Sequence, residues 1–364
     1  MSVKIKTFGD KNKETGQLCR LEEGFLSLNC EIISSDDNID LIYAHGAVGW
    51  NHAIILHHSL NKKPILLLKV LDLGRHTNPD YLVMREKLKY ADLILSNSEV
   101  IKNEIKKYLC LDSYTVFDCI KDVYYNQNIK KDNDFLAVGR LAYSEKRFFL
   151  IKELCLLEEN KNKKLVCCDS SDPNFGSFLG IVSDEKLNYL YNSSKFVLCV
   201  SREEGLLLPM LEGFVTGCIP IICNDMSTAY EFAPKKFICE PNIESINSKI
   251  KEIENNYLYF HKICLEYGDR YKKFFNKKQI AQNILNAFTL AKQKREKISL
   301  NNKNRNKNIH NWTSLPNLHC IKCNLNNMSD YGVRMGWFDF LNKEWDSKEH
   351  ENLINDVDQY CLVN

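Results

Sequence analysis

Two glutamates, Glu204 and Glu212, stand eight positions apart in the stretch CVSREEGLLLPMLEG, one on each side of an apolar run. The preceding residues 195–201, KFVLCVS, predict a strand, so the residues after them form a loop. Pro209 suits the first turn of a helix, and Gly217 suits its left-handed end. We therefore expect Glu204 in the loop and Glu212 about one turn into the helix.

The loop between these glutamates has the properties of an anion site. The backbone N–H groups of Gly205, Leu206 and Leu207 approach the positive end of the predicted helix, where phosphates bind readily. Gly205 has no side chain that would obstruct close contact. A carboxylate on each side of the loop can accept hydrogen bonds from sugar hydroxyls. Sugar hydroxyls, a diphosphate and ribose hydroxyls come one after another in this order in a nucleotide sugar.

The positive charges that a diphosphate needs occur in the stretch AVGRLAYSEKRFF. Arg140 follows a predicted strand and Gly139, and Lys146 lies six residues later. In an open parallel sheet the strands' carboxyl ends meet at one edge, so we expect both cations on the same rim as the glutamates. Each charge taken singly is also consistent with ordinary surface charge. Their combination on successive loops of one domain favours a binding site.

Strand and helix patterns alternate along most of the chain, which predicts two doubly wound α/β domains. The polar stretch 120–134 lacks periodicity and is interpreted as the linker. We therefore predict an N-terminal domain over 1–122 and a second domain over 123–290, with a ligand cleft between their strand ends. The strands are expected at 3–8, 29–34, 40–46, 64–72, 92–98, 114–119, 134–141, 164–169, 195–201 and 218–224.

These motifs together resemble the retaining glycosyltransferases of family 4, the group 1 glycosyltransferases, which have the two-domain GT-B fold. The family pattern is a Gly-Arg, a lysine about six residues later, and a motif of the form E-G-x-x-x-P-x-x-E. This chain has Gly139-Arg140, Lys146, and EGLLLPMLE from Glu204 to Glu212. The resemblance covers about 40–290 and is strongest over 135–232. It implies a GT-B fold and an enzyme that transfers a sugar with retention of anomeric configuration.

The resemblance also implies roles for individual residues. Arg140 and Lys146 would hold the leaving diphosphate, Glu204 the donor sugar, and Glu212 the ribose hydroxyls. His76 or Asp72 would contact the sugar or the acceptor hydroxyl, although relatives often have a His-Asp pair there. Further donor-binding residues would be Gly139, Gly180, Ile181, Val182, Gly205, Leu206 and Leu207, and the acceptor side would include Gly16, His45 and Asp72.

The family needs neither a metal ion nor a cofactor, so the resemblance implies a metal-independent hexosyltransferase. The donor is expected to be a nucleotide sugar, a UDP-sugar by frequency alone, and the acceptor a glycan or lipid-linked hydroxyl. Two alternatives remain open at this point. One is a glycosyltransferase that acts on a modified base of DNA, and the other is a catalytically inactive module that binds nucleotide sugars.

The composition of the chain bears on which partners it can bind and in which compartment it is found. The net charge of +2 over 364 residues argues against a dedicated nucleic-acid binder. No run approaches 18 apolar residues, and the start of the chain lacks a signal-peptide pattern. We interpret most of the 15 cysteines as buried, reduced thiols. These features predict a cytoplasmic protein, with the inner face of a membrane as an alternative place.

The segment 291–364 differs in character from the rest. It begins with a basic strip, expected to be a solvated linker or the end of a helix, that could also contact membrane phosphates or nucleic acid. An aromatic-rich tail of unassigned fold comes next. Cys320 and Cys323 have the spacing of metal ligands, with His319 and His310 nearby, but a second cysteine pair is missing.

Overall fold

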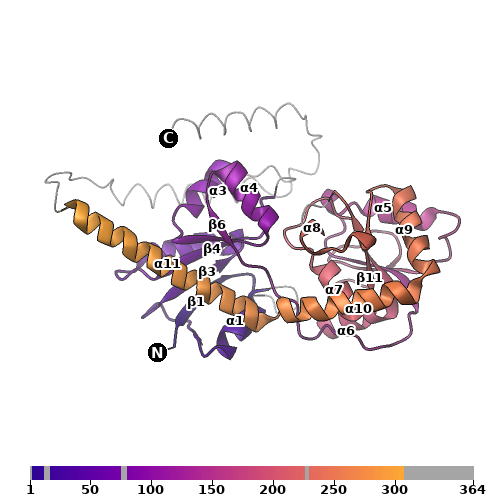
Figure 1. Cartoon of the computed structure of the whole chain (residues 1–364), viewed down its shortest axis with the longest axis horizontal. Helices are drawn as coiled ribbons and strands as arrows, with labels where there is room; N and C mark the ends of the chain where they lie inside the picture. The colour runs from indigo at the N-terminus through magenta and orange to yellow at the C-terminus, as the bar shows by residue number, and fades with distance from the viewer. Residues whose placement is uncertain (1, 12–16, 75–79, 226–228, 307–364) are drawn as a thin grey trace. The chain divides into compact units, whose positions relative to one another are not determined.

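We describe the chain from a computed structural model, which places residues 2–11, 17–74, 80–225 and 229–306. The chain divides into two units. The first unit contains Met1–Leu73 and Tyr81–Ala291 and holds both sheets of the protein; the second contains Gly74–Asp80 and Lys292–Asn364. Strands and helices alternate along the first unit (Figure 1).

The first sheet has six parallel strands in the order β2-β1-β3-β4-β5-β6. Its central strands β3 and β4 are buried on both faces, as their unbroken apolar sequences predict. The strands are β1 (Lys4–Gly9), β2 (Glu31–Ile32), β3 (Leu41–His45), β4 (Ile65–Val70), β5 (Leu93–Ser96) and β6 (Ser113–Thr115).

Helices cover both faces of this sheet. One face, which includes Tyr43 and Leu67, packs with helix α1 in a single apolar cluster. Helix α2 packs against β1, β3 and β4 and buries Trp50 and Ile54, which lie outside that cluster. The helices of this part are α1 (Leu18–Ser27), α2 (Ala47–Ser59), α3 (Tyr81–Leu88) and α4 (Glu99–Leu109).

The second sheet also has six parallel strands, in the order β12-β11-β10-β7-β8-β9. The short edge strands β9 and β12 are not among the strands expected from the sequence. The strands are β7 (Asn133–Val138), β8 (Leu165–Cys168), β9 (Ser177–Phe178), β10 (Ser194–Cys199), β11 (Ile219–Cys223) and β12 (Ile238–Cys239).

The helices of the second sheet begin and end where their sequences indicate. Ser183 caps α6 by accepting a hydrogen bond from the Lys186 amide, and Gly217 ends α7 with a φ of +75°. The helices are α5 (Phe148–Leu156), α6 (Asp184–Ser193), α7 (Leu208–Thr216), α8 (Ala229–Phe232), α9 (Ile243–Asn255) and α10 (Tyr257–Phe274), with 3-10 helices η2 (Ser144–Lys146) and η3 (Lys235–Phe237).

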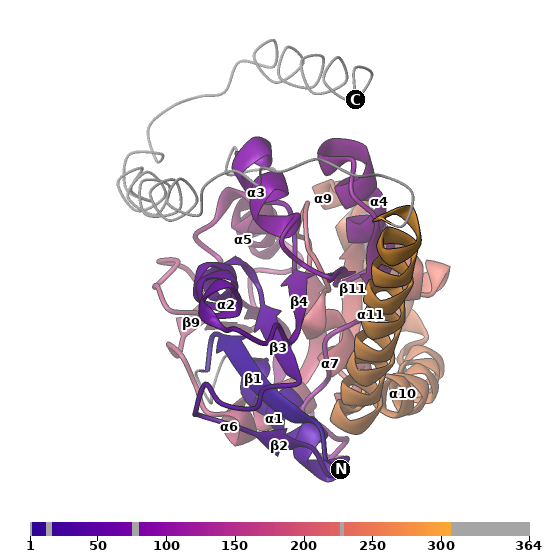
Figure 2. The same cartoon turned by 90° about the vertical axis from the view of Figure 1, so that its left-hand side faces the viewer.

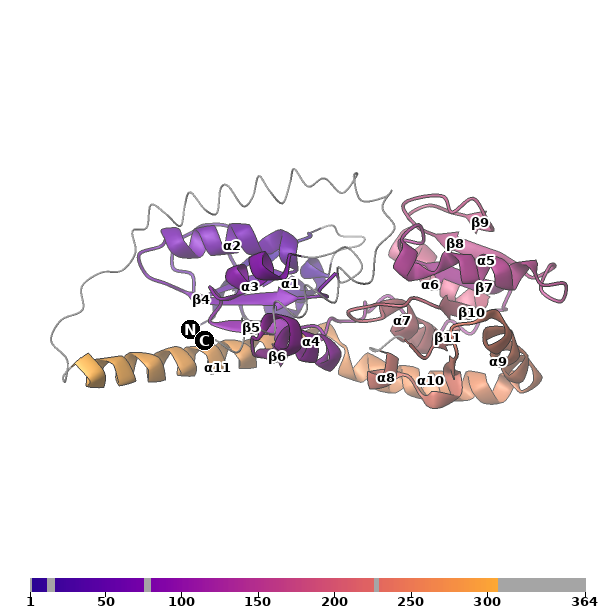
Figure 3. The same ribbon diagram turned by 90° about the horizontal axis from the view of Figure 1, so that it is seen from above.

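The last helix of the described residues, α11 (Lys277–Asn306), returns the chain to the first sheet. Its residues Ile280, Ile284, Ala287 and Ala291 are fully buried in the same apolar cluster as α1. Figures 2 and 3 show α11 beside the first sheet, on the face opposite α2. Residues 280–290, which the predicted second domain includes, therefore pack with the first sheet. The helical period identifies a buried face but does not say which sheet covers it.

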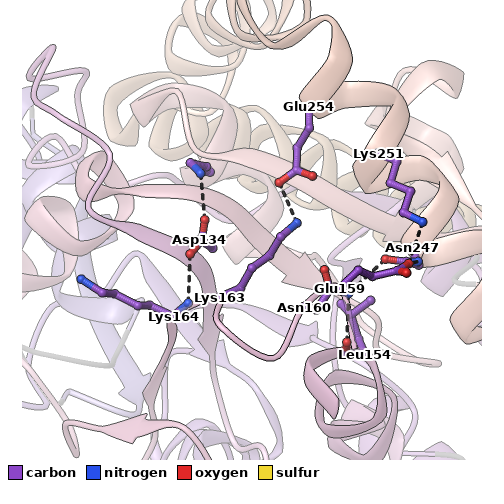
Figure 4. Close-up of polar contacts among 10 residues, drawn as sticks. Asp134, Leu154, Glu159, Asn160, Lys163, Lys164, Asn247, Lys251 and Glu254 are labelled. Atoms are coloured by element: carbon purple, nitrogen blue, oxygen red, sulfur yellow. Dashed lines mark hydrogen bonds and ion pairs between the residues drawn. The ribbon is translucent and has the colours of Figure 1, made fainter. Parts of the chain in front are cut away.

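Polar side chains close the amino-terminal edge of the second sheet (Figure 4). Asp134, at the start of β7, accepts hydrogen bonds from the Lys164 amide at 2.9 Å and the Lys195 ammonium at 2.8 Å. Nearby, Lys163 pairs with Glu254 at 2.7 Å. These charges satisfy one another, so we interpret this edge as structural. The candidate binding residues Lys146 and Glu204 lie at the opposite, carboxyl-terminal edge of the sheet.

Eleven cysteines of the described residues carry free thiols, and ten of these are buried, which confirms the expectation for them. Cys110 is an exception, because it is disulfide-bonded. Within the described residues, no helix is long and apolar enough to cross a membrane.

Candidate functional site

At the carboxyl edge of the second sheet, Lys146 and Glu204 form an ion pair. Helix η2 carries Lys146, and the loop after β10 carries Glu204. Their side chains are only 17% and 16% exposed. A Cβ atom on Gly139 would lie 3.8 Å from the Lys146 ammonium nitrogen. The structure therefore brings Gly139, Lys146 and Glu204 together, as the sequence motifs predict.

Backbone contacts fix the two loops that carry this pair. The Arg202 amide donates to the Glu145 carbonyl at 2.7 Å, which ties the loop after β10 to η2. The Leu141 amide donates to the buried carboxylate of Asp169 at 2.6 Å, which fixes the turn after Gly139. These contacts fix the loop of Lys146 and the loop of Glu204 relative to each other.

The two arginines near Lys146 differ from each other. Arg140 is exposed, and its guanidinium lies 5.0 Å from the centre of the Tyr143 ring. Arg147 binds both carboxylate oxygens of Asp225, with one of the two contacts at 3.0 Å. The charge of Arg147, which directly follows Lys146, is thus paired with a carboxylate. Of these two arginines, Arg140 is the exposed one.

Glu212 lies in a more buried environment than Glu204. Its side chain projects from α7 and accepts a hydrogen bond from the Tyr191 hydroxyl at 2.8 Å. Burial raises the pKa of Glu212, while the Tyr191 hydrogen bond and the positive charges of Arg20 and Lys121 oppose this rise. A buried carboxylate with few donors gains from any hydroxyl that reaches it.

Several neighbours of Glu212 gave no signal in the sequence. Lys121 follows the first sheet and pairs with Asp184 at the start of α6. Burial lowers the pKa of Lys121, and the Asp184 carboxylate partly restores it. The Cys199 thiol at the end of β10 has a raised pKa, chiefly from burial, with the charges of Glu204 and Glu212 adding to it. Cys199 thus lies within electrostatic range of both motif glutamates.

The loop between the glutamates requires glycine at its first position. A Cβ atom on Gly205 would lie 1.9 Å from the Leu71 carbonyl oxygen, which is too close for any other residue. Leu206 and Leu207 are buried, so their side chains anchor the loop while their amides precede α7. Ligand access was the only reason for Gly205 that the sequence offered, and the structure adds this backbone contact.

The predicted donor-binding residues Gly180, Ile181 and Val182 precede α6. Gly180 has a φ of +70°, and no atom would lie within 4 Å of a Cβ placed there. Ile181 is 58% exposed, and Val182 is half-buried. An exposed isoleucine beside an open glycine can provide an apolar contact for a planar ring.

In the first sheet, the predicted acceptor residue His45 belongs to a buried ionic cluster. His45 Nε2 lies 2.9 Å from an Asp118 carboxylate oxygen, and the same oxygen accepts from the Lys69 ammonium. All three side chains are buried. Asp72 is exposed. Gly16 and His76 lie outside the described residues, so their predicted roles stay predictions.

Asp118 and Lys69 were not identified from the sequence. Lys69 gave a signal that could have been used, since it is the one charged residue in the apolar run PILLLKVL. A lysine in a strand buried on both faces needs a carboxylate partner. Asp118 gave none, because it comes from a strand end far away in the chain.

The described residues hold no group of three His, Cys, Asp or Glu side chains placed to bind a metal ion. Cys320, Cys323, His310 and His319 lie outside the described residues.

The sequence of the chain was compared with protein families and with known proteins. No family model matches the chain. A putative glycosyltransferase of Sulfolobus islandicus filamentous virus is 30% identical over 108 residues, covering 28% of this chain and 30% of that protein. The Repetitive organellar protein of Plasmodium falciparum is 29% identical over 136 residues, covering 33% and 7%. The chain thus spans less than a third of either relative.

Solved structures resemble the chain over most of its length. Sucrose-phosphate synthase from Thermosynechococcus elongatus has a TM-score of 0.65 and 13% identity, covering 79% of this chain and 98% of that one. HepE of Anabaena, solved in complex with UDP-glucose, has a TM-score of 0.63 and 13% identity, covering 79% and 100%. The two parallel sheets with alternating helices therefore have the GT-B glycosyltransferase fold, as predicted.

Proposed function

We propose that the chain is a glycosyltransferase that moves a sugar from a nucleotide-diphosphate sugar to an acceptor hydroxyl with retention of configuration. The observation that carries the proposal is the Lys146–Glu204 pair at the carboxyl edge of the second sheet in a GT-B fold. Ligands of open α/β sheets bind at this edge. HepE, which shares the fold, was solved with UDP-glucose, and this supports a UDP-sugar as the first donor to test.

The charges of the site divide into two functions. Lys146 and Arg140 bind the diphosphate and neutralise it as it leaves. When the anionic donor binds, the Lys146 ammonium can donate hydrogen bonds to the phosphate. The Glu204 carboxylate can then accept a hydrogen bond from a hydroxyl of the donor sugar. Glu212 accepts from the ribose hydroxyls. No cofactor or metal ion is required in this scheme, because the side-chain cations supply the positive charge.

The chemical step uses these roles. The bond between the anomeric carbon and the diphosphate oxygen breaks while the acceptor oxygen bonds to the same face of that carbon. The acceptor's proton passes to the leaving diphosphate, so no proton is gained or lost overall. The acceptor is proposed to be a hydroxyl of a glycan or a lipid-linked sugar, bound on the side of the first sheet.

A donor screen tests this proposal. The purified chain is heated with UDP-, GDP- and ADP-sugars, and its melting temperature is compared with that of the free protein. A ligand that binds only the folded state at 100 times its Kd stabilises it by about 2.7 kcal/mol. At least one nucleotide sugar should raise the melting temperature by several degrees. The absence of a shift with every donor would refute the proposed function.

A further inference from the structure

Asn97 ends the strand β5 and is almost completely buried. Its amide donates to the Val70 carbonyl at 3.1 Å, so the backbone continues the ladder with β4. The side chain belongs to a residue that is 3% exposed. Its oxygen Oδ1 is buried and has no hydrogen-bond partner among the described residues. Buried polar atoms are almost always hydrogen-bonded, so this atom requires an explanation.

The position of Asn97 relates this unpaired oxygen to the donor site. A Cβ atom placed on Gly205 would lie 3.6 Å from the side-chain nitrogen of Asn97. Gly205 directly follows Glu204, which pairs with Lys146. The amide of Asn97 therefore lies beside the loop that carries the proposed sugar-binding carboxylate.

The chemistry of an asparagine amide fits a sugar. The amide offers a hydrogen-bond acceptor and two donors, and a hydroxyl group can pair with either kind of atom. It carries no charge, so it contributes little to the binding of a diphosphate. An unpaired buried acceptor also discriminates between ligands. A ligand hydroxyl that pairs with it binds more tightly, whereas a ligand without that hydroxyl leaves the acceptor unpaired.

We infer that Asn97 is a sugar-binding residue of the first sheet, and that its buried Oδ1 accepts a hydrogen bond from a hydroxyl of the donor sugar. This inference rests on the proposed function, since it requires a nucleotide-sugar donor. It adds a residue that neither the family motif nor the sequence pattern contains.

The test compares two ligands in one variant. Calorimetry measures the Kd of the best nucleotide sugar from the donor screen and the Kd of its nucleoside diphosphate. Asn97→Leu should raise the first Kd by about tenfold, because a buried hydroxyl loses its acceptor. It should change the second by less than about twofold. Asn97→Asp, which keeps an acceptor oxygen, should bind the nucleotide sugar more tightly than Asn97→Leu.

A matched control uses a buried asparagine whose bonds are satisfied. Asn160 donates to the Leu154 carbonyl and to Asn247, both at 3.0 Å (Figure 4). Asn160→Leu should alter neither Kd, although it lowers stability. If Asn97→Leu fails to fold, Asn97→Ala takes its place.

The results separate two kinds of failure. Equal weakening of both ligands, or no change in either, would overturn the role of Asn97 while leaving the proposed function intact. The same holds if Asn160→Leu changes the ratio of the two Kd values as much as Asn97→Leu does. If the wild-type protein binds no nucleotide sugar, the proposed function fails, and this inference fails with it.

Discussion

Glu212 combines a buried position with positively charged neighbours. Its carboxylate accepts a hydrogen bond from the Tyr191 hydroxyl and lies near the charges of Arg20 and Lys121. A solvated surface glutamate would have neither property. This environment suits a carboxylate that receives the hydroxyls of a ribose, because exclusion of water strengthens each hydrogen bond.

Glu212→Ala should weaken nucleotide binding by about 1–3 kcal/mol, because a buried ribose hydroxyl loses its acceptor. The Kd of the free nucleotide, measured by calorimetry, reports this change without requiring turnover. Glu185→Ala is the control, since Glu185 is an exposed glutamate in the first turn of α6. Unchanged nucleotide affinity in Glu212→Ala would remove Glu212 from the site.

At the scale of elements, the first sheet depends on a buried ionic cluster. The strands β3 and β4 end at His45 and Val70, and Asp118 follows β6. Burial alone would raise the pKa of Asp118, but the charges and hydrogen bonds of Lys69 and His45 hold it well below its usual value. The cluster therefore joins three strand ends at the edge where a ligand would bind.

Asp118→Asn should lower the free energy of unfolding by about 3 kcal/mol, because it leaves the buried Lys69 ammonium without its carboxylate. Chemical denaturation at neutral pH measures the loss. Glu86→Gln, which breaks the exposed pair with Lys89, should cost less than about 1 kcal/mol.

The pH dependence of the same cluster has a definite sign. The folded pKa of Asp118 is depressed, so its stabilisation is present above the unfolded value, about 3.9, and is lost as pH falls below it. Wild-type stability should therefore fall more steeply below about pH 4 than that of Asp118→Asn. Parallel acid profiles for the two proteins would contradict the role assigned to Asp118.

The sequence predicted the elements well and their contacts poorly. The strands with four or more apolar residues, such as β4 and β10, were identifiable because burial on both faces leaves an unbroken apolar run. The motif residues Lys146 and Glu204 were identifiable because they follow such strands. Asp118, Tyr191 and Asn97 were not, since their importance depends on neighbours that are distant in the chain.

At the scale of the whole molecule, the chain forms the first sheet, then the second sheet, and then packs helix α11 against the first sheet. Helix α11 buries apolar residues in the core of the first sheet after the second sheet is complete. A helical period can show that a helix has a buried face, but it does not show which sheet covers that face.

Lys146 and Arg140 are proposed to act on a departing diphosphate. Charge builds on that group as the glycosidic bond breaks, so contacts with Lys146 and Arg140 should strengthen in the transition state. Arg140→Lys should not fully restore the activity lost in Arg140→Ala, because a single ammonium cannot make a two-pronged phosphate contact. Since Arg147 is paired with Asp225, it should not replace Lys146.

The most direct measurement is nucleotide-sugar turnover by the wild-type protein, by Lys146→Ala and by the double variant at Lys146 and Arg147. We predict that Lys146→Ala folds normally and loses at least about a hundredfold in kcat, with a smaller change in the Kd of the donor. The double variant controls for the neighbouring arginine. Turnover of the donor at the wild-type rate by the double variant would mean that the diphosphate is bound elsewhere, and it would contradict this mechanism.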